Sequence, residues 1–232
     1  MLTLEHVTAT KGTFTLNADI TINPGQKLAI IGPSGSGKST LLDVIAGFLP
    51  VTNGKVIWKG QDLTTAPPGA RPVSLLFQDN NLFPHLTIAQ NTGLGLRPDL
   101  KLNAAQKTQV EDALARVGLS GRGTDKPGAL SGGQQSRAAL ARVLLQGTPL
   151  VLLDEPFSAL GPALKAEMLA LLADVLSDTR ATLLMVTHDP ADAMAVAKNL
   201  VLVADGVAHA AVDVVTGFEN PTPALKAYLG GS

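Results

Sequence analysis

The stretch from Gly32 to Ser39 has the residue types and the spacing that bind phosphate groups. Its sequence, GPSGSGKS, matches the pattern Gly-x-x-x-x-Gly-Lys-Ser/Thr, and it lies between a short apolar run and a helix pattern. Glycines let the backbone wrap phosphates with its N–H groups inward, while the lysine reaches the β- and γ-phosphates and the serine hydroxyl ligates Mg²⁺. We therefore expect a nucleotide to be bound by Gly32, Pro33, Ser34, Gly35, Ser36, Gly37, Lys38, Ser39 and Thr40.

Two carboxylates, Asp154 and Glu155, directly follow the apolar run PLVLL. Buried parallel strands present their functional residues at the carboxyl edge of the sheet, where a phosphate loop also lies. We expect Asp154 to hold Mg²⁺, directly or through water, and Glu155 to orient and polarise the attacking water. An acidic pair after a strand is more often a helix cap or a solvated turn, but the phosphate loop in the same chain favours the catalytic interpretation.

Two further polar residues follow apolar runs in the same way. His188 ends the run ATLLMVTH and could hydrogen bond to a γ-phosphate, while Gln78 follows VSLLF and could contact Mg²⁺ or the attacking water. Each is a weak signal alone, because a single histidine is usually structural or exposed. We add both to the candidate catalytic residues and Gln78 to the candidate metal ligands.

A second anion-binding turn opens the stretch LSGGQQSRAALAR, from Leu130 to Arg142. A Ser-Gly-Gly sequence at a helix start leaves N–H groups unpaired at the positive end of the helix dipole, where anions bind. The chain thus contains two phosphate-binding turns about a hundred residues apart, and one nucleotide needs only one of them.

The elements that must position these residues follow from the hydropathy pattern. The segments LTLEHV and FTLNADITI alternate apolar and polar residues, and KVIWKGQDL is typical of an edge strand or hairpin. Apolar strands followed by loops and helices predict an α/β fold with a mostly parallel sheet flanked by helices. We expect an N-terminal antiparallel β subdomain, an inserted helical subdomain at about residues 80–145, and a short helix in NPTPALKAYLGGS.

Length and composition are consistent with one domain spanning residues 1–232. A content of 45% hydrophobic residues excludes a disordered chain, and the net charge of −1 gives no reason to expect a nucleic-acid partner. The chain has no cysteine, and its N-terminus lacks the pattern of a secretory signal. No apolar stretch is long enough to span a membrane, so any work at a membrane would require a partner protein.

These motifs, in this order and spacing, resemble those of the ATP-binding cassette (ABC) ATPases, a family with a phosphate-loop nucleotide-hydrolase core. The resemblance covers nearly the whole chain and includes LSGGQ, LLDEP and the histidine after the next strand. In that family two cassettes pair head to tail on binding ATP. The resemblance therefore implies that Ser131, Gly132, Gly133 and Gln134 bind the nucleotide of a second copy, which explains the second turn.

The resemblance also implies an ATP- and Mg²⁺-dependent ATPase that energises an ABC importer at the cytoplasmic face of the bacterial inner membrane. Permease subunits would dock near the Gln78 loop and the helical subdomain, and a periplasmic or extracellular solute-binding protein would deliver the solute. The stretch with NNLFPHLT, GLGL and LKLNAAQ is similar to the ATPase subunits of thiamine importers. Iron, sugar, polyamine or sulfate importers remain alternatives, and no C-terminal regulatory domain is expected.

The sequence departs from the family pattern at two positions. SALGPAL places Gly161 where the family usually has an aspartate that contacts the opposite subunit, and Phe14 is the one aromatic candidate for stacking on adenine in the first hairpin. Because of these departures, a second function stays open for this chain: a nucleotide-gated clamp that dimerises on ATP with little hydrolysis. A cassette that works without a transporter is disfavoured, because no coiled-coil insertion or tandem cassette is present.

Overall fold

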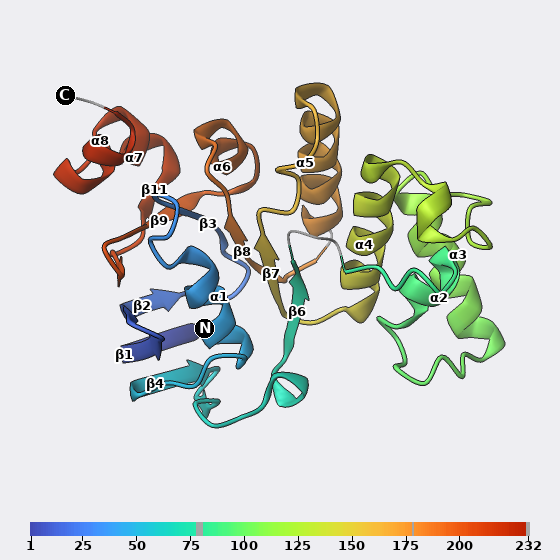
Figure 1. Cartoon of the computed structure of the whole chain (residues 1–232), viewed down its shortest axis with the longest axis horizontal. Coiled ribbons are helices and arrows are strands. Elements are labelled where there is room, and N and C mark those ends of the chain that lie inside the picture. Colours follow the sequence, from blue (N-terminus) through green and yellow to red (C-terminus); the bar gives the residue numbers. More distant parts are fainter. Residues whose placement is uncertain (78–80, 178, 231–232) are drawn as a thin grey trace.

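The computed structural model of the chain describes residues 1–77, 81–177 and 179–230. Within these residues the strands form one eleven-stranded sheet, in the order β5-β4-β1-β2-β10-β9-β3-β8-β7-β6, with β11 pairing to β9. Helices cover the sheet, and a group of helices lies beyond β6 (Figure 1). No helix in the described part of the chain is long and apolar enough to cross a membrane.

The centre of the sheet is parallel and carries the candidate site at one edge. It consists of β3 (Lys27–Ile31), β6 (Val73–Leu76), β7 (Leu150–Asp154), β8 (Thr182–Val186) and β9 (Asn199–Ala204). β8 is buried throughout and β7 is buried except at its last residue, because helices cover both faces. Since β3, β8, β7 and β6 are adjacent and parallel, the loops that follow them meet at one edge.

The antiparallel part of the sheet contains β1 (Leu2–Lys11), β2 (Phe14–Ile22), β4 (Asn53–Trp58) and β5 (Gln61–Asp62). Burial along β2 alternates residue by residue, as its sequence pattern predicts for a strand with one exposed face. The short strand β10 (Val207–Ala208) runs parallel to β2 and antiparallel to β9, and so joins the two parts of the sheet.

Two sets of helices complete the chain. The sheet is covered by α1 (Lys38–Ala46), α5 (Pro162–Ser177), α6 (Pro190–Val196), α7 (Val214–Glu219) and α8 (Pro223–Tyr228). Beyond β6 lie α2 (Ile88–Gly93), α3 (Ala104–Arg116) and α4 (Gly132–Gln146), which are grouped on one side of the molecule (Figure 1). These three helices share a separate apolar cluster that includes Ile88, Val110, Leu114 and Ala138. One-turn 3₁₀ helices occur at Pro68–Ala70 and Pro127–Ala129.

The predicted α/β class is confirmed, including the parallel centre, the N-terminal antiparallel strands and the helices inserted after β6. The hairpin β4–β5 and the helix α8 also match their predictions. The sequence analysis missed β10, β11 (Val212–Asp213) and α7, because elements of two to six residues are too short for a clear periodicity.

Candidate nucleotide-binding site

The loop Gly32–Ser39 connects β3 to α1 and packs tightly against its neighbours. Gly32 has φ 149°, and a Cβ there would overlap the carbonyl oxygen of Val203 on β9. Gly37 has φ 107°, and a Cβ there would lie 2.7 Å from Cζ of Phe14. Glycine is therefore required at both ends of the loop, because the backbone lies directly against β9 and against the Phe14 ring.

The ammonium of Lys38 is folded onto this loop. Its Nζ donates to the carbonyl oxygens of Gly32 and Pro33, both at 2.8 Å, and the residue is only 7% exposed. Burial lowers the pKa of Lys38, although the nearby carboxylates Glu155 and Asp154 oppose the shift. A bound anion would compensate this poorly solvated charge better than two carbonyl groups do.

A second buried polar atom of the loop lacks a partner. Oγ of Ser36 is buried and has no hydrogen-bond partner among the described residues. Buried hydroxyls in native proteins nearly always have a partner, so an unpaired one in a phosphate loop indicates a place for a ligand.

Asp154 ends β7 beside the start of α1, and the side chain of Ser39 lies close enough to its carboxylate to oppose the rise in its pKa. Burial raises the pKa of Asp154, and repulsion from Glu155 and Asp43 acts in the same direction, whereas Ser39 and Lys38 oppose it. A hydroxyl and a carboxylate together are oxygen donors of the kind that Mg²⁺ binds alongside nucleotide phosphates. The residues present therefore fit a magnesium ion.

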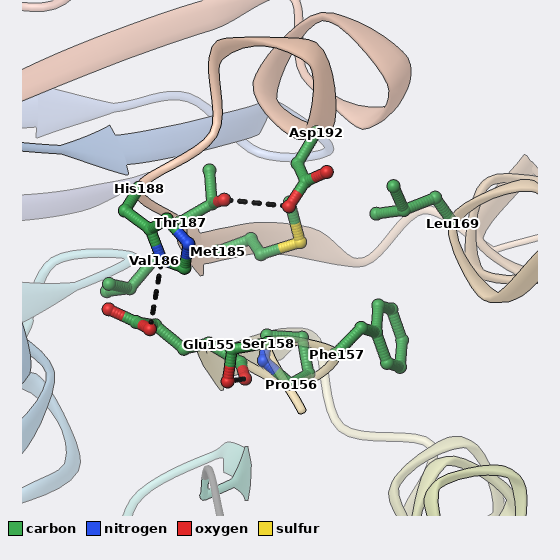
Figure 2. A pocket seen from close by; sticks show the side chains of 10 residues that line it. All are labelled: Glu155, Pro156, Phe157, Ser158, Leu169, Met185, Val186, Thr187, His188 and Asp192. Carbon is green, nitrogen blue, oxygen red and sulfur yellow. Dashed lines mark hydrogen bonds and ion pairs between the residues drawn. The ribbon is translucent and has the colours of Figure 1, made fainter. Parts of the chain in front are cut away.

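Glu155 and His188 come from the ends of neighbouring strands and face each other (Figure 2). Nδ1 of His188 lies 3.2 Å from Oε2 of Glu155, and their side chains are 61% and 24% exposed, so a ligand can reach both. The Glu155 backbone has φ 45° and its N–H donates to the carbonyl of Val186 at 3.2 Å. A left-handed backbone at a non-glycine residue is strained, and such strain clusters at functional sites.

The residues on either side of His188 are fixed by a partly buried polar network. The Thr187 hydroxyl donates to the carboxylate of Asp192 on α6 at 2.9 Å, as Figure 2 shows, and the Asp189 N–H donates to the same hydroxyl at 3.1 Å. Nζ of Lys165, on α5, lies 2.6 Å from the carboxylate of Asp189 and 2.9 Å from that of Asp192. The hydrogen bond from Lys165 to Asp189 holds the pKa of Asp189 below its usual value. The sequence analysis missed Lys165 and Asp192; the Asp-Pro pair that starts α6 was the available signal.

A cavity of about 420 Å³ opens next to the phosphate loop, and Lys11 and Phe14 of the first hairpin are among the residues that line it. The other lining residues are Ser34, Gly35, Gly37, Lys38, Ser39, Thr40 and Glu155. Phe14 was the aromatic residue considered from the sequence, whereas Lys11 was not considered. Nζ of Lys11 lies 3.3 Å from the carboxylate of Asp43 on α1.

The second predicted phosphate turn lies at the start of α4, away from this cavity. Ser131 caps the helix: its Oγ accepts from the N–H of Gln134 at 3.4 Å, and the Gln134 side chain accepts from the N–H of Ser131 at 3.0 Å. Ser131 and Gly132 are exposed, while Gly133 is buried against Leu164 of α5. None of these residues lines the described cavity at the phosphate loop, and α4 and α1 lie on opposite sides of β6 and β7 (Figure 1).

The structure therefore brings together the phosphate loop, Asp154, Glu155 and His188, and leaves Ser131–Gln134 apart from them. Gln78 lies outside the described residues. In the described part of the chain, no three His, Asp or Glu side chains gather as a metal site.

Comparisons with known proteins identify the family and the fold. The family profile described as ABC transporter matches residues 16–158. The thiamine import ATP-binding protein ThiQ of Cereibacter sphaeroides is 57% identical over 99% of this chain and 100% of its own length. The protein of the same name from Ruegeria sp. is 54% identical over 99% of this chain and 100% of its own length, and that of Shigella flexneri is 50% identical over 89% of each.

Solved structures are also similar. The dimeric ABC cassette MJ0796 in a post-hydrolysis state bound to ADP and Pi has a TM-score of 0.80 and 28% identity, over 92% of this chain and 99% of its own. A second dimeric structure of this cassette has the same TM-score of 0.80 with 29% identity.

Proposed function

This chain belongs to the ABC transporter family, and on that premise we propose that it is the ATP-hydrolysing subunit of a thiamine importer. The observation that carries the proposal is the edge of the sheet where the phosphate loop, Asp154 and the Glu155–His188 pair meet. Phosphate binding, metal binding and activation of water are the three requirements of nucleotide hydrolysis, and each has candidate residues at this edge.

In this proposal the loop amides and Lys38 bind the β- and γ-phosphates of ATP. Ser39 and Asp154, with Gln78 as a further candidate, would hold Mg²⁺, which supplies positive charge against the negative charge of the phosphates. Glu155 orients a water molecule and accepts its proton as the water oxygen bonds to the γ-phosphorus. The bond from that phosphorus to the leaving oxygen of ADP then breaks, which yields ADP and phosphate. His188, held beside Glu155, donates to the γ-phosphate.

The proposed active unit is a head-to-tail homodimer. Ser131, Gly132, Gly133 and Gln134 would close over the nucleotide of the second copy. Support comes from the exposed position of Ser131 and Gly132 and from the dimeric solved structures of similar cassettes. ATP would then hold two subunits together, and hydrolysis would release them.

An aromatic groove is the proposed docking place for the permease subunits. A cavity of about 400 Å³ lies between the end of α1, the end of β6 and the segment before α2, and it is lined by Phe48, Phe77 and Phe83. Phe48 and Phe83 are 55% and 47% exposed, which is unusual for large apolar residues unless a partner covers them. Docking there would place the chain peripherally at the cytoplasmic face of the bacterial inner membrane, with the permease against Phe77 and Asn81.

The proposed cargo is thiamine or its phosphate esters, because relatives named as thiamine import ATP-binding proteins match nearly the whole chain. The cassette would not contact the cargo, which would come from an external binding protein through the permease. A nucleotide-gated clamp with little hydrolysis is the second candidate, and Gly161 in the loop after Glu155 is the observation that favours it.

The test is steady-state ATP hydrolysis by the complex in lipid, with and without binding protein loaded with thiamine. We expect strong stimulation by the loaded protein. Stimulation by another solute in place of thiamine would contradict the cargo but keep the ATPase. ATP-dependent dimerisation without turnover would contradict hydrolysis and favour the clamp.

A further inference from the structure

Tyr228, on α8, contacts both of the loops that meet at the candidate site. Its hydroxyl donates to the backbone carbonyl of His188 at 3.1 Å. The backbone amide of Gly32, the first residue of the phosphate loop, lies close enough to the same phenol to oppose the rise in its pKa. One hydroxyl group near the C-terminal end of the described chain is therefore bonded to the histidine loop (Thr187–Asp189) and lies beside the start of the phosphate loop.

We infer that Tyr228 is a positioning residue for ATP hydrolysis, which holds His188 in register with Glu155 and with the phosphate loop. The inference rests on the proposed ATPase function and extends it to α8, an element that contributes no residue to the cavity at the phosphate loop.

The position of the phenol is fixed by packing. α8 is capped by Thr222, whose Oγ1 accepts from the N–H of Leu225 at 3.4 Å, and Leu225 is buried in the apolar cluster that covers the centre of the sheet. The Tyr228 ring packs against the same cluster. Burial raises the pKa of Tyr228, so the phenol stays protonated and keeps its donor for the His188 carbonyl at neutral pH.

His188 needs such support because its own side chain is mostly exposed and is held by one contact to Glu155. The partly buried network of Lys165, Thr187 and Asp192 fixes the residues on either side of His188. The Tyr228 contact acts on the His188 backbone itself, and it connects that backbone to α8, beside Gly32, rather than to α5 or α6. Loss of this contact would let the His188 backbone shift, and such a shift matters because catalytic contacts to protons and phosphates depend on precise positioning.

The first test is Tyr228→Phe in the reconstituted complex, because phenylalanine keeps the ring and removes the hydroxyl. We expect kcat to fall about three- to tenfold, the range that corresponds to one lost hydrogen bond of ordinary net strength. The KM for ATP should change less than about twofold, because Lys38 and the loop amides still bind the nucleotide. Lys226→Met, on an exposed face of the same helix, is the matched control and should leave both constants unchanged.

A double-mutant cycle separates positioning of His188 from a general effect on the fold. In a His188→Ala background, where residual turnover is measured, Tyr228→Phe should have little further effect. An equal loss in both backgrounds would overturn the inference, as would an unchanged kcat for Tyr228→Phe in an active complex. Absence of turnover in the wild-type complex would instead contradict the proposed ATPase function. That outcome is distinguishable from failure of the Tyr228 inference, which requires an active wild-type complex.

The chain offers a second, independent test because Tyr228 is its one tyrosine. Producing the chain with a polyfluorinated tyrosine lowers the pKa of this phenol, and the phenolate cannot donate to the His188 carbonyl. After assembly with unmodified permease, we expect kcat to decline as the pH rises through the new pKa. The Tyr228→Phe chain grown on the same analogue should show no such decline, and an identical pH profile for both chains would contradict the inference.

Discussion

At the scale of single residues, the site contains charged groups that are poorly solvated because they are buried. Burial raises the pKa of Asp154 and lowers the pKa of Lys38, so in both residues the environment disfavours the charged form. Opposite shifts at neighbouring groups are typical of functional sites, where stability is given up for binding. The two charges lie where phosphate and metal would compensate them.

Asp154→Asn should make the ligand-free protein more stable at pH 7. The pKa of Asp154 is raised in the folded state, so its ionised form costs stability at pH values above that raised pKa. The cost disappears as the pH falls below the carboxyl group's ordinary pKa, because the group is then protonated in both states. Thermal unfolding of both proteins between pH 7 and pH 3 should show a stability gain at neutral pH that vanishes in acid; a constant difference would contradict the assignment.

Glu155→Gln should keep ATP binding and remove most turnover, since an amide can orient water but cannot accept its proton. We expect a loss of kcat of about a hundredfold or more, in the range of general base catalysis. Gel filtration with ATP should show a dimer that persists, because the nucleotide is no longer cleaved. Undiminished turnover would refute the assigned base.

At the scale of elements, the connection from β7 to α5 combines strain with order. It begins at Glu155 with φ 45°, and the Ser158 hydroxyl donates to the carbonyl of Glu155 at 3.1 Å. The carbonyl of Gly161 accepts from the N–H of Lys165 at 2.9 Å, which starts α5. This loop thus fixes the candidate base at one end and Lys165, which holds the histidine loop, at the other.

Gly161→Asp should preserve or raise turnover. A Cβ at Gly161 meets no atom within 4 Å, so the aspartate fits without a clash and supplies the carboxylate that the family resemblance leads us to expect at this position. A fall in turnover for Gly161→Asp would mean that the loop is adapted to glycine.

At the scale of the whole molecule, one chain holds two phosphate-binding turns that do not share a cavity. The cavity at the phosphate loop is lined by residues of the first hairpin, the loop itself, α1 and Glu155, whereas Ser131 lies at the start of α4. Their separation within one chain is the geometric reason to expect that each site is completed by a second copy.

Mixed dimers test this arrangement. Lys38→Ala and Ser131→Arg should each abolish ATP-driven dimerisation, since either change damages both sites of a homodimer. When the two variants are mixed, a head-to-tail heterodimer has one site with both defects and one intact site. In a Glu155→Gln background we expect the mixture to trap one nucleotide per dimer, and the separate variants none. A mixture that traps no nucleotide would contradict completion of the site in trans.

Much of the fold and part of the site were predictable because their signals are local. The GPSGSGKS loop between a strand and a helix specifies its own backbone path, and continuous apolar runs identify buried strands. Polar residues at strand ends predicted that Asp154, Glu155 and His188 would meet, and the structure brings Glu155 and His188 to 3.2 Å. The roles assigned to these residues stay predictions.

The residues that the sequence did not indicate act over long separations in the chain. Lys165 contacts a loop 24 residues away, and Tyr228 contacts His188 from 40 residues away. Both are ordinary helix residues in the sequence, and no local pattern distinguishes them from residues that only pack.

By itself, the sequence determined the types of the elements, the phosphate loop and the polar residues that end the strands, because periodicity and motif geometry are properties of short segments. Only the tertiary structure decided that β3 lies between β8 and β9, that α5 and α8 brace the histidine loop, and that the two phosphate turns lie apart. The physical reason is that the choice of neighbours depends on how the whole chain buries its apolar faces, and that choice is not encoded in any single segment.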